Sequence, residues 1–229
     1  MRLFCFPYAG GLAQIFHSWP ESLATKVEIC AVQLPGRGSR LREAPFNRLT
    51  LLVQALAEVL SPQMDRPIAF FGHSMGAIIG FELARLLRAN DHRQPLHLFV
   101  SGRRAPHLPE IEPPAHMLPD ADFLAHLSKL NGTPSQILQH PELMELMLPT
   151  LRADFALIET YEYKPEPAFD FPITAFGGLR DTYASRADLE LWREHTHAEF
   201  SLHMFPGDHF FINSSQTLLL QALSRKLVI

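Results

Sequence analysis

Cysteine is scarce in this sequence. Only two of the 229 residues are cysteines, Cys5 and Cys30, and each lies in a short apolar run of the kind that forms a strand. A scaffold built on disulfides uses several cysteines at characteristic spacings, which this chain does not have. We interpret both residues as free thiols that pack as small hydrophobic side chains, and we expect a reduced, cytoplasmic setting.

Long apolar runs and an excess of positive charge are also missing. The apolar residues 3–6 end at Pro7, which makes the run too short for a signal peptide, and no run is long enough to cross a membrane. The formal net charge is −4 and lysine and arginine form no dense cluster, so we expect neither a membrane nor a nucleic acid as partner. With 47% hydrophobic and 19% charged residues, the composition is that of one folded domain with at most a modest insertion.

Short apolar runs alternate with helical patterns along most of the chain. The candidate strands are residues 3–6, 27–32, 68–71, 96–100, 173–176 and 200–205. The candidate helices are residues 49–60, 76–87 and 215–227, the last of them capped by Asn213 or Ser214. This order is typical of βα units and predicts an α/β fold with a mostly parallel central sheet flanked by helices.

Residues 106–172 interrupt this alternation. The segment is rich in proline, shows helical patterns over residues 121–130 and 141–160, and contains no convincing strand. An insertion of this kind packs over one end of a sheet and forms a binding lid. We therefore predict a core made of residues 1–105 and 173–229 and a helical lid made of residues 106–172.

The strongest catalytic signal is a G-x-S-x-G motif at residues 72–76, between an apolar strand pattern and a helical run of small residues. A sharp strand-to-helix turn holds such a serine in a strained backbone conformation, so the positions two residues away must lack side chains. Gly72 and Gly76 meet this requirement. We predict that Ser74 is the nucleophile of an α/β-hydrolase, and that the free N–H of Met75 at the helix N-terminus binds an oxyanion.

A serine nucleophile needs a base to take its proton and an acid to orient that base, and in this fold the chain order is serine, acid, histidine. Of the twelve histidines, His209 follows the last candidate strand and precedes the last helix. Asp181 follows the preceding strand, whereas Asp208 is too close to His209 in sequence and Asp154 falls in the lid. We predict a triad of Ser74, His209 and Asp181; the alternative role for Asp181 is to cap the helix after it.

A second oxyanion donor should come from the loop after the first strand, residues 7–11. This loop contains two adjacent glycines, which let the backbone approach a substrate closely. We predict that the donor is the N–H of Ala9, with Tyr8 as the alternative.

With these residues identified, the chain resembles the type II thioesterases, the stand-alone editing enzymes of polyketide and nonribosomal peptide assembly lines. The resemblance extends over nearly the whole length and is carried by LFCFPYAGG at residues 3–11, QLPGRGSR at 33–40, FGHSMGA at 71–77 and PGDHFF at 206–211. The P-x-A-G-G and P-G-R-G-x-R patterns are far more specific than the serine motif alone.

The resemblance implies hydrolysis of acyl or aminoacyl thioesters on the phosphopantetheine arm of acyl or peptidyl carrier proteins. It implies no metal or redox cofactor, and the pair His195 and His197 lacks a third ligand nearby. We expect a monomer. The alternative function is a small-molecule carboxylesterase or lipase of the same fold, which shares the triad. A binding module that has kept the fold without activity is disfavoured, because the triad is complete.

Several further residues have two interpretations. Arg37 and Arg40 either meet an acidic carrier protein or, as we favour, form structural salt bridges. Phe16 and Trp19 either line the acyl pocket or, as we favour, belong to the core. A third group either contacts the acyl chain or packs the lid, and its members are Leu118, Phe123, Leu127 and Phe155.

Overall fold

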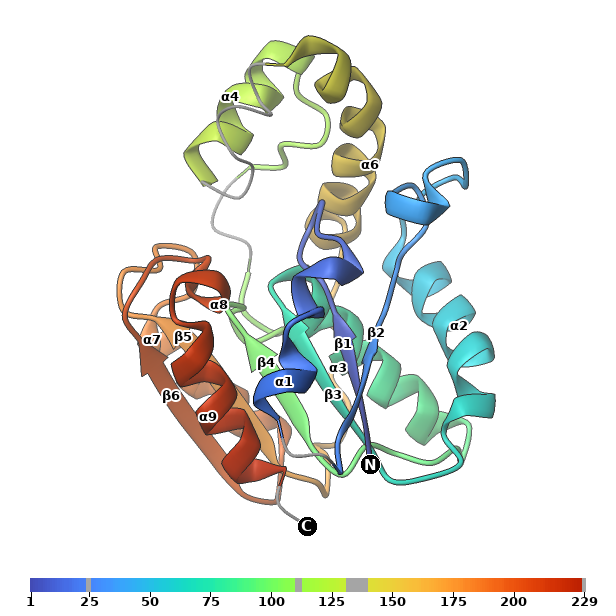
Figure 1. The fold of residues 1–229 in the computed structure, drawn as a ribbon, viewed down its shortest axis with the longest axis vertical. Helices are drawn as coiled ribbons and strands as arrows, with labels where there is room; N and C mark the ends of the chain where they lie inside the picture. The colour runs from blue at the N-terminus through green and yellow to red at the C-terminus, as the bar shows by residue number, and fades with distance from the viewer. Residues whose placement is uncertain (24–25, 110–112, 131–139, 228–229) are drawn as a thin grey trace.

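One parallel sheet organises the molecule. The computed structural model describes residues 1–23, 26–109, 113–130 and 140–227. Six strands lie in the order β2-β1-β3-β4-β5-β6, and every neighbouring pair is parallel (Figure 1). The strands are β1 (Arg2–Phe6), β2 (Glu28–Ala31), β3 (Ile68–His73), β4 (Leu98–Ser101), β5 (Ile173–Gly178) and β6 (Phe200–Phe205). All six predicted strands are therefore confirmed.

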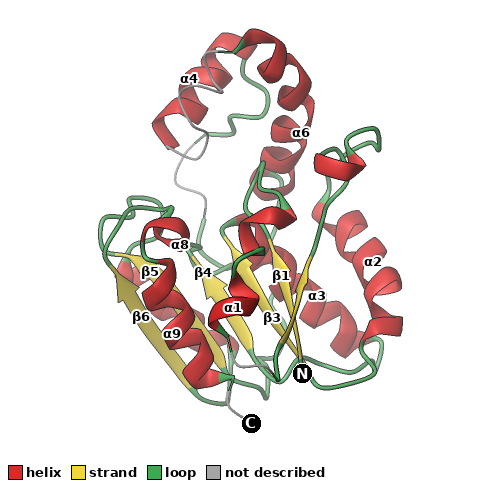
Figure 2. Ribbon diagram, in the orientation of Figure 1, coloured by secondary structure: helices red, strands yellow, loops and turns green. Residues whose placement is uncertain are grey.

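Helices cover both sides of this sheet (Figure 2). They are α1 (Trp19–Ser22), α2 (Leu49–Leu60), α3 (Met75–Ala89), α7 (Arg186–Glu190), α8 (Phe211–Ser214) and α9 (Gln216–Lys226). Short 3₁₀ turns occur at η1 (Ala13–Phe16), η2 (Gly38–Arg40), η3 (Ser61–Gln63) and η4 (Leu191–His195). The predicted helices over residues 49–60, 76–87 and 215–227 are confirmed to within two residues at each end.

The alternation of side chains along β1 shows how both faces are buried. Phe4 and Phe6 belong to one core cluster with residues of α2 and α3, whereas Leu3 and Cys5 belong to a second cluster with residues of α1 and α9. Strands buried on both faces appear in sequence as continuous apolar runs. That is why these strands could be recognised without an alternating pattern.

The predicted cap of the last helix is wrong. Asn213 and Ser214 lie inside the short helix α8, and α9 begins only after Ser215, whose hydroxyl donates to the carbonyl oxygen of Pro206 at 2.5 Å. The chain makes this extra helical turn after β6 before α9 starts. The sequence pattern did not reveal α8, so the predicted cap falls within this short helix and not in a loop before α9.

The predicted insertion contributes α4 (Asp120–Leu130) and α6 (Pro141–Glu159), which extend beyond the end of the sheet in Figure 1. These bounds confirm the two helices expected there, and the described residues between β4 and β5 form no strand. The insertion has a small core of its own that includes Phe123 and Leu127. Phe169 and Phe171, however, pack in the main core beside α3. By its packing, the insertion therefore rejoins the core before residue 172.

Both cysteines are free thiols, as predicted. Cys5 is buried in the core, and this burial raises the pKa of its thiol. None of the helices in the described part of the chain is both long enough and apolar enough to span a membrane.

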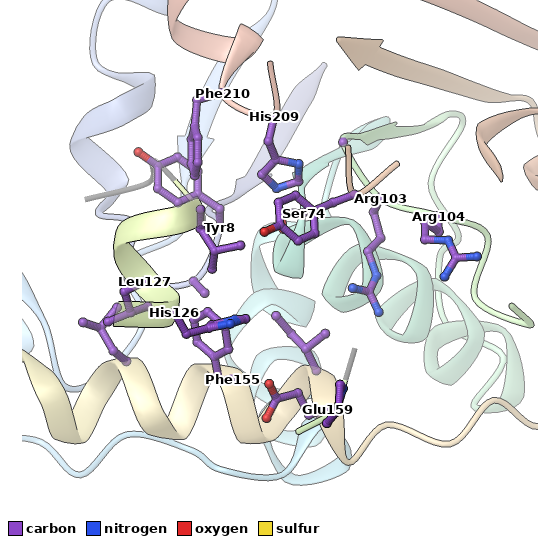
Figure 3. A pocket seen from close by; sticks show the side chains of 17 residues that line it. Tyr8, Ser74, Arg103, Arg104, His126, Leu127, Phe155, Glu159, His209 and Phe210 are labelled. Atoms are coloured by element: carbon purple, nitrogen blue, oxygen red, sulfur yellow. The ribbon is translucent and has the colours of Figure 1, made fainter. Parts of the chain in front are cut away.

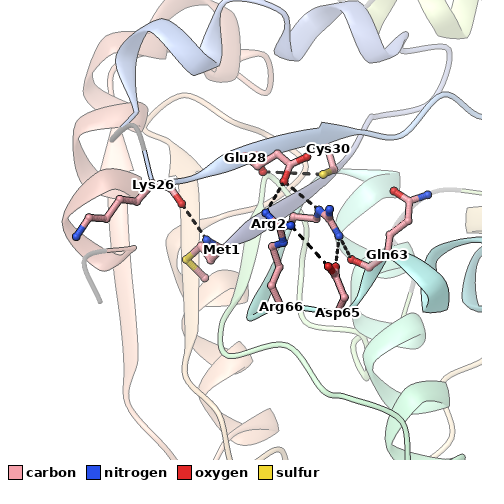
Figure 4. A network of polar contacts seen from close by, with 8 residues as sticks. All are labelled: Met1, Arg2, Lys26, Glu28, Cys30, Gln63, Asp65 and Arg66. Atoms are coloured by element: carbon pink, nitrogen blue, oxygen red, sulfur yellow. Dashed lines mark hydrogen bonds and ion pairs between the residues drawn. The ribbon is translucent and has the colours of Figure 1, made fainter.

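A polar network joins three strands at the end where β1 begins (Figure 4). Arg2 donates from Nε to Oε2 of Glu28 at 3.0 Å and also pairs with Asp65, just before β3. Both carboxylates are more than half exposed, so solvent screens these ion pairs and each contributes little to the stability of the fold. The network aligns β1 with its neighbouring strands where these strands begin. Ser74 lies at the opposite end of the sheet, directly after β3 ends.

Candidate active site

Ser74 lies in the turn between β3 and α3, with φ 53° and ψ −113°. Its left-handed backbone is strained for a residue with a side chain. A Cβ on Gly72 would lie 2.0 Å from the carbonyl oxygen of Gly76, and a Cβ on Gly76 would lie 2.1 Å from that of Phe6. Both glycines are required by close backbone contacts, as the motif predicted.

Asp181 and His209 are hydrogen-bonded, with 2.9 Å between Oδ2 of the carboxylate and Nδ1 of the ring. The side chain of Asp181 is fully buried, and its other oxygen accepts the N–H groups of Tyr183 at 2.8 Å and Ala184 at 3.2 Å. The following helix, α7, is capped by Ser185 instead. Asp181 is therefore an orienting partner of the histidine ring, and the alternative role as a helix cap is wrong.

Ser74 and His209 line the same pocket, which has a volume of about 150 Å³ (Figure 3). No hydrogen bond joins the serine hydroxyl to the histidine ring among the described residues. Such catalytic hydrogen bonds are often long in unliganded enzymes and shorten when substrate is bound. The structure thus joins the predicted acid to the predicted base and places the predicted nucleophile in the pocket that the base lines.

Of the two predicted oxyanion donors, Ala9 lines this pocket, whereas Met75 follows Ser74 in the chain and is not among the described lining residues. The N–H of Ala9 has no hydrogen-bond partner in the part of the chain that the structure describes. Met75 is the first residue of α3, where backbone N–H groups have no partner within the helix. Tyr8 also lines the pocket, and its ring packs edge-on against Phe210 with 5.1 Å between centroids.

A second histidine lies beneath the site. Nδ1 of His73 is 2.8 Å from the hydroxyl of Ser101, and its ring centroid is 5.3 Å from that of His209. Complete burial holds the pKa of His73 well below its ordinary value, and the nearby His209 lowers it further. His73 is therefore neutral at neutral pH and adds no positive charge beside His209. The sequence placed His73 within the turn but did not show this contact.

The insertion supplies the apolar side of the pocket. Leu127 of α4 and Phe155 of α6 line it and also pack in the cluster of the insertion, so both residues hold the lid together, and contact with an acyl chain stays a prediction. Phe123 packs within the insertion without lining the pocket, and Leu118 is 37% exposed. The lining residues that the sequence did not single out include Leu130, Leu151, Ile158, Arg103, Arg104, His126 and Glu159. The two arginines come just after β4, separated from it by Gly102, at the strand ends where sites of this fold occur. This position in the sequence was a usable signal.

The other residues with two interpretations have structural roles. Arg37 is buried in an ion pair with Asp154, and Arg40 forms an exposed pair with Glu43. Phe16 and Trp19 are fully packed in the core.

His195 and His197 lie apart from the active-site pocket. Nε2 of His195 is 2.9 Å from Nδ1 of His107, and His195 is mostly buried. The described residues contain no group of three or more metal-ligating side chains.

Residues 1–227 match the family described as the thioesterase domain. The chain belongs to this family. The thioesterase is 47% identical over 227 residues to the gramicidin S biosynthesis protein GrsT of Aneurinibacillus migulanus, covering 99% of this chain and 89% of the relative. It is 46% identical to the linear gramicidin dehydrogenase LgrE of Brevibacillus parabrevis, covering 98% of this chain and 87% of the relative. Among solved structures, the type II thioesterase BorB from the borrelidin biosynthetic cluster aligns with a TM-score of 0.90 and 36% identity over 99% of this chain and 92% of BorB.

These similarities confirm the resemblance to type II thioesterases and the α/β-hydrolase fold. The thioesterase is an enzyme of the serine hydrolase class that acts on thioesters. Its pocket, with an acid-base pair on one side and apolar side chains on the other, has the features that such a reaction needs.

Proposed function

We propose that this thioesterase hydrolyses acyl or aminoacyl groups from the phosphopantetheine arm of acyl and peptidyl carrier proteins, and so regenerates the carriers of a polyketide or nonribosomal peptide synthase. The relatives named for gramicidin S and borrelidin biosynthesis support this substrate class. The observation that carries the proposal is the Asp181–His209 pair beside Ser74, in a pocket with an apolar wall for an acyl chain.

In the proposed reaction, Ser74 attacks the thioester carbonyl while His209 takes the hydroxyl proton. Asp181 remains ionised and stabilises the imidazolium. The N–H groups of Ala9 and Met75 hold the oxyanion. Collapse of the tetrahedral intermediate breaks the carbon–sulfur bond, and His209 gives its proton to the departing thiolate. Water, activated by the same histidine, then hydrolyses the acyl-enzyme and restores the Ser74 hydroxyl.

The proposed reaction needs no metal and no redox group from the protein. The phosphopantetheine arm arrives as part of the carrier-protein substrate. We expect the enzyme to act as a monomer on individual carrier domains, which sedimentation at assay concentrations will check.

The decisive assay presents carrier proteins loaded with acetyl, octanoyl or aminoacyl groups and follows release by intact mass spectrometry. We expect release from carriers, and faster hydrolysis of acyl-pantetheine thioesters than of matched oxygen esters. Preference for the oxygen esters would favour the carboxylesterase alternative. Because LgrE is named a dehydrogenase, a parallel reaction with an aldehyde and NADPH provides a useful control. Labelling of Ser74 by a fluorophosphonate, absent in Ser74→Ala, checks the nucleophile.

A further inference from the structure

Helix α6 of the insertion contacts the loop that carries the proposed oxyanion donor Ala9. Oδ2 of Asp154 accepts a hydrogen bond from the N–H of Gly10 at 2.7 Å, although 144 residues separate them. One helical turn earlier, Leu151 packs so closely that a Cβ on Gly10 would lie 2.6 Å from its Cδ2. Gly10 itself has φ +74°, a left-handed conformation that favours glycine. The surface of α6 is therefore complementary to the loop of residues 7–11 in the conformation that Gly10 adopts in this structure.

A buried arginine neutralises this carboxylate. Arg37 donates from Nη1 to Oδ2 and from Nη2 to Oδ1 of Asp154, each at 2.6 Å, and the two side chains are only 6% and 1% exposed. Such a bidentate pair has a defined geometry. An unpaired negative charge at this depth would oppose the oxyanion formed nearby. With its charge matched by Arg37, Asp154 acts on the loop as an oriented hydrogen-bond acceptor.

The hydrogen bonds of this loop determine where the Ala9 N–H points. The carbonyl oxygen of Tyr8 accepts the N–H of Gly11 at 2.8 Å, and it shares one planar peptide unit with the Ala9 N–H. The next peptide unit is held by Asp154 through Gly10, and the carbonyl oxygen of Gly11 accepts from Arg37 at 3.4 Å. These hydrogen bonds hold the peptide groups of Gly10 and Gly11. They therefore also restrain the neighbouring peptide plane, which contains the Ala9 N–H and sets its direction.

We propose that Asp154, with Arg37, is a positioning residue for the oxyanion hole. The inference rests on the proposed function only in taking the Ala9 N–H as an oxyanion donor. The insertion then has two roles, because α6 both lines the acyl pocket and holds the loop that stabilises the transition state. The ion pair joins residues 117 positions apart, from the loop before η2 and from α6.

The test replaces the ion pair by apolar side chains of similar size, in the double variant Arg37→Met with Asp154→Leu. Such replacements are often neutral or stabilising, but the Gly10 N–H loses its acceptor. We expect the unfolding temperature to be retained, KM for an acyl-carrier to be unchanged, and kcat to fall about 100-fold, the loss typical of an impaired oxyanion hole. A folded double variant with wild-type kcat overturns the proposal.

Two single variants complete the design. Asp154→Asn keeps an oxygen that can accept the Gly10 N–H, so its kcat should fall about threefold to tenfold at unchanged KM. Arg152→Met removes a neighbouring arginine of α6 that pairs with Asp120, and should leave kcat unchanged. If the double variant does not fold, Asp154→Asn decides alone: reduced kcat at constant KM supports the positioning role, and wild-type kcat refutes it.

The rate of Ser74 phosphonylation by a fluorophosphonate separates this inference from the proposed substrate. That reaction also develops negative charge in the oxyanion hole, and it requires no carrier protein. If the wild-type enzyme releases nothing from carriers but its labelling rate falls in the double variant, only the substrate assignment fails. Equal labelling rates in the folded double variant and the wild type refute the positioning role whatever the substrate.

Discussion

Nδ1 of His209 lies 2.9 Å from Oδ2 of Asp181, a carboxylate whose other oxygen is held by two backbone N–H groups. This arrangement fixes the tautomer and orientation of the ring. Because 28 residues separate the two partners, the contact depends on the neighbouring ends of β5 and β6.

Substitutions of the three triad residues should lower kcat by different amounts. We expect Ser74→Ala and His209→Ala each to lower kcat by about 10⁶-fold, and Asp181→Asn by about 10⁴-fold, because the histidine remains present but is held in the wrong tautomer. Steady-state hydrolysis of an acyl-pantetheine thioester measures these losses. Circular dichroism should show that all three variants remain folded. A His209→Ala variant with near wild-type turnover would refute the assignment.

The serine turn predicts a contrast between two glycines of α3. Gly76→Ala places a Cβ 2.1 Å from the carbonyl oxygen of Phe6, so we expect it to destabilise the protein by more than about 3 kcal/mol or to prevent folding. At Gly80, one turn further along, the nearest atom to a Cβ lies at 3.5 Å. Gly80→Ala should be neutral or stabilising by about 1 kcal/mol, because alanine favours helix. Urea unfolding of both variants checks this difference.

The apolar wall of the pocket predicts a shift in acyl preference. Phe155→Ala removes a ring from the pocket lining and enlarges the space for an acyl chain. We expect kcat/KM for octanoyl relative to acetyl carriers to rise about tenfold. Phe123→Leu is the matched control, because this ring contacts Phe155 at 5.3 Å between centroids but does not line the pocket. Its relative kcat/KM should stay at the wild-type value; an equal shift in the control would contradict the prediction.

Buried histidines predict a loss of stability in acid. Burial lowers the pKa of His97 to about 4, with a smaller contribution from Lys226, while Nε2 of His97 lies 2.8 Å from the hydroxyl of Thr174. In the unfolded chain this histidine has a pKa of about 6.5. Below that value the unfolded state binds the proton more tightly, so the free energy of unfolding should fall between pH 6.5 and 4, by at most about 3 kcal/mol from this residue.

Denaturant unfolding across this pH range measures the effect of His97. His97→Gln keeps a hydrogen-bonding side chain that does not titrate, so its stability should decline less steeply between pH 6.5 and 4. His92→Gln, at an exposed position, is the control and should follow the wild type. Identical slopes for His97→Gln and the wild type would show that this histidine does not contribute.

Much of this architecture was predictable because its signals are local. A strand covered on both faces, such as Ile68–His73, is a continuous apolar run, and the glycines around Ser74 mark a turn whose steric limits involve few residues. The order of serine, acid and histidine along the chain then selected Asp181 and His209 from many carboxylates and imidazoles. The end of the insertion was less predictable, because Phe169 looks the same in sequence whether it packs on the lid or on α3.

Local periodicity and steric limits were enough to predict the strands, the serine turn and the residues able to perform acyl transfer. Three further features became visible only in the folded chain: the bonds of Asp154 to Gly10 and Arg37, the contact of His73 with His209, and the side chains of α4 and α6 that line the pocket. These contacts join segments distant along the chain. They depend on how helices and loops pack against the sheet, and no local pattern of residues encodes that packing.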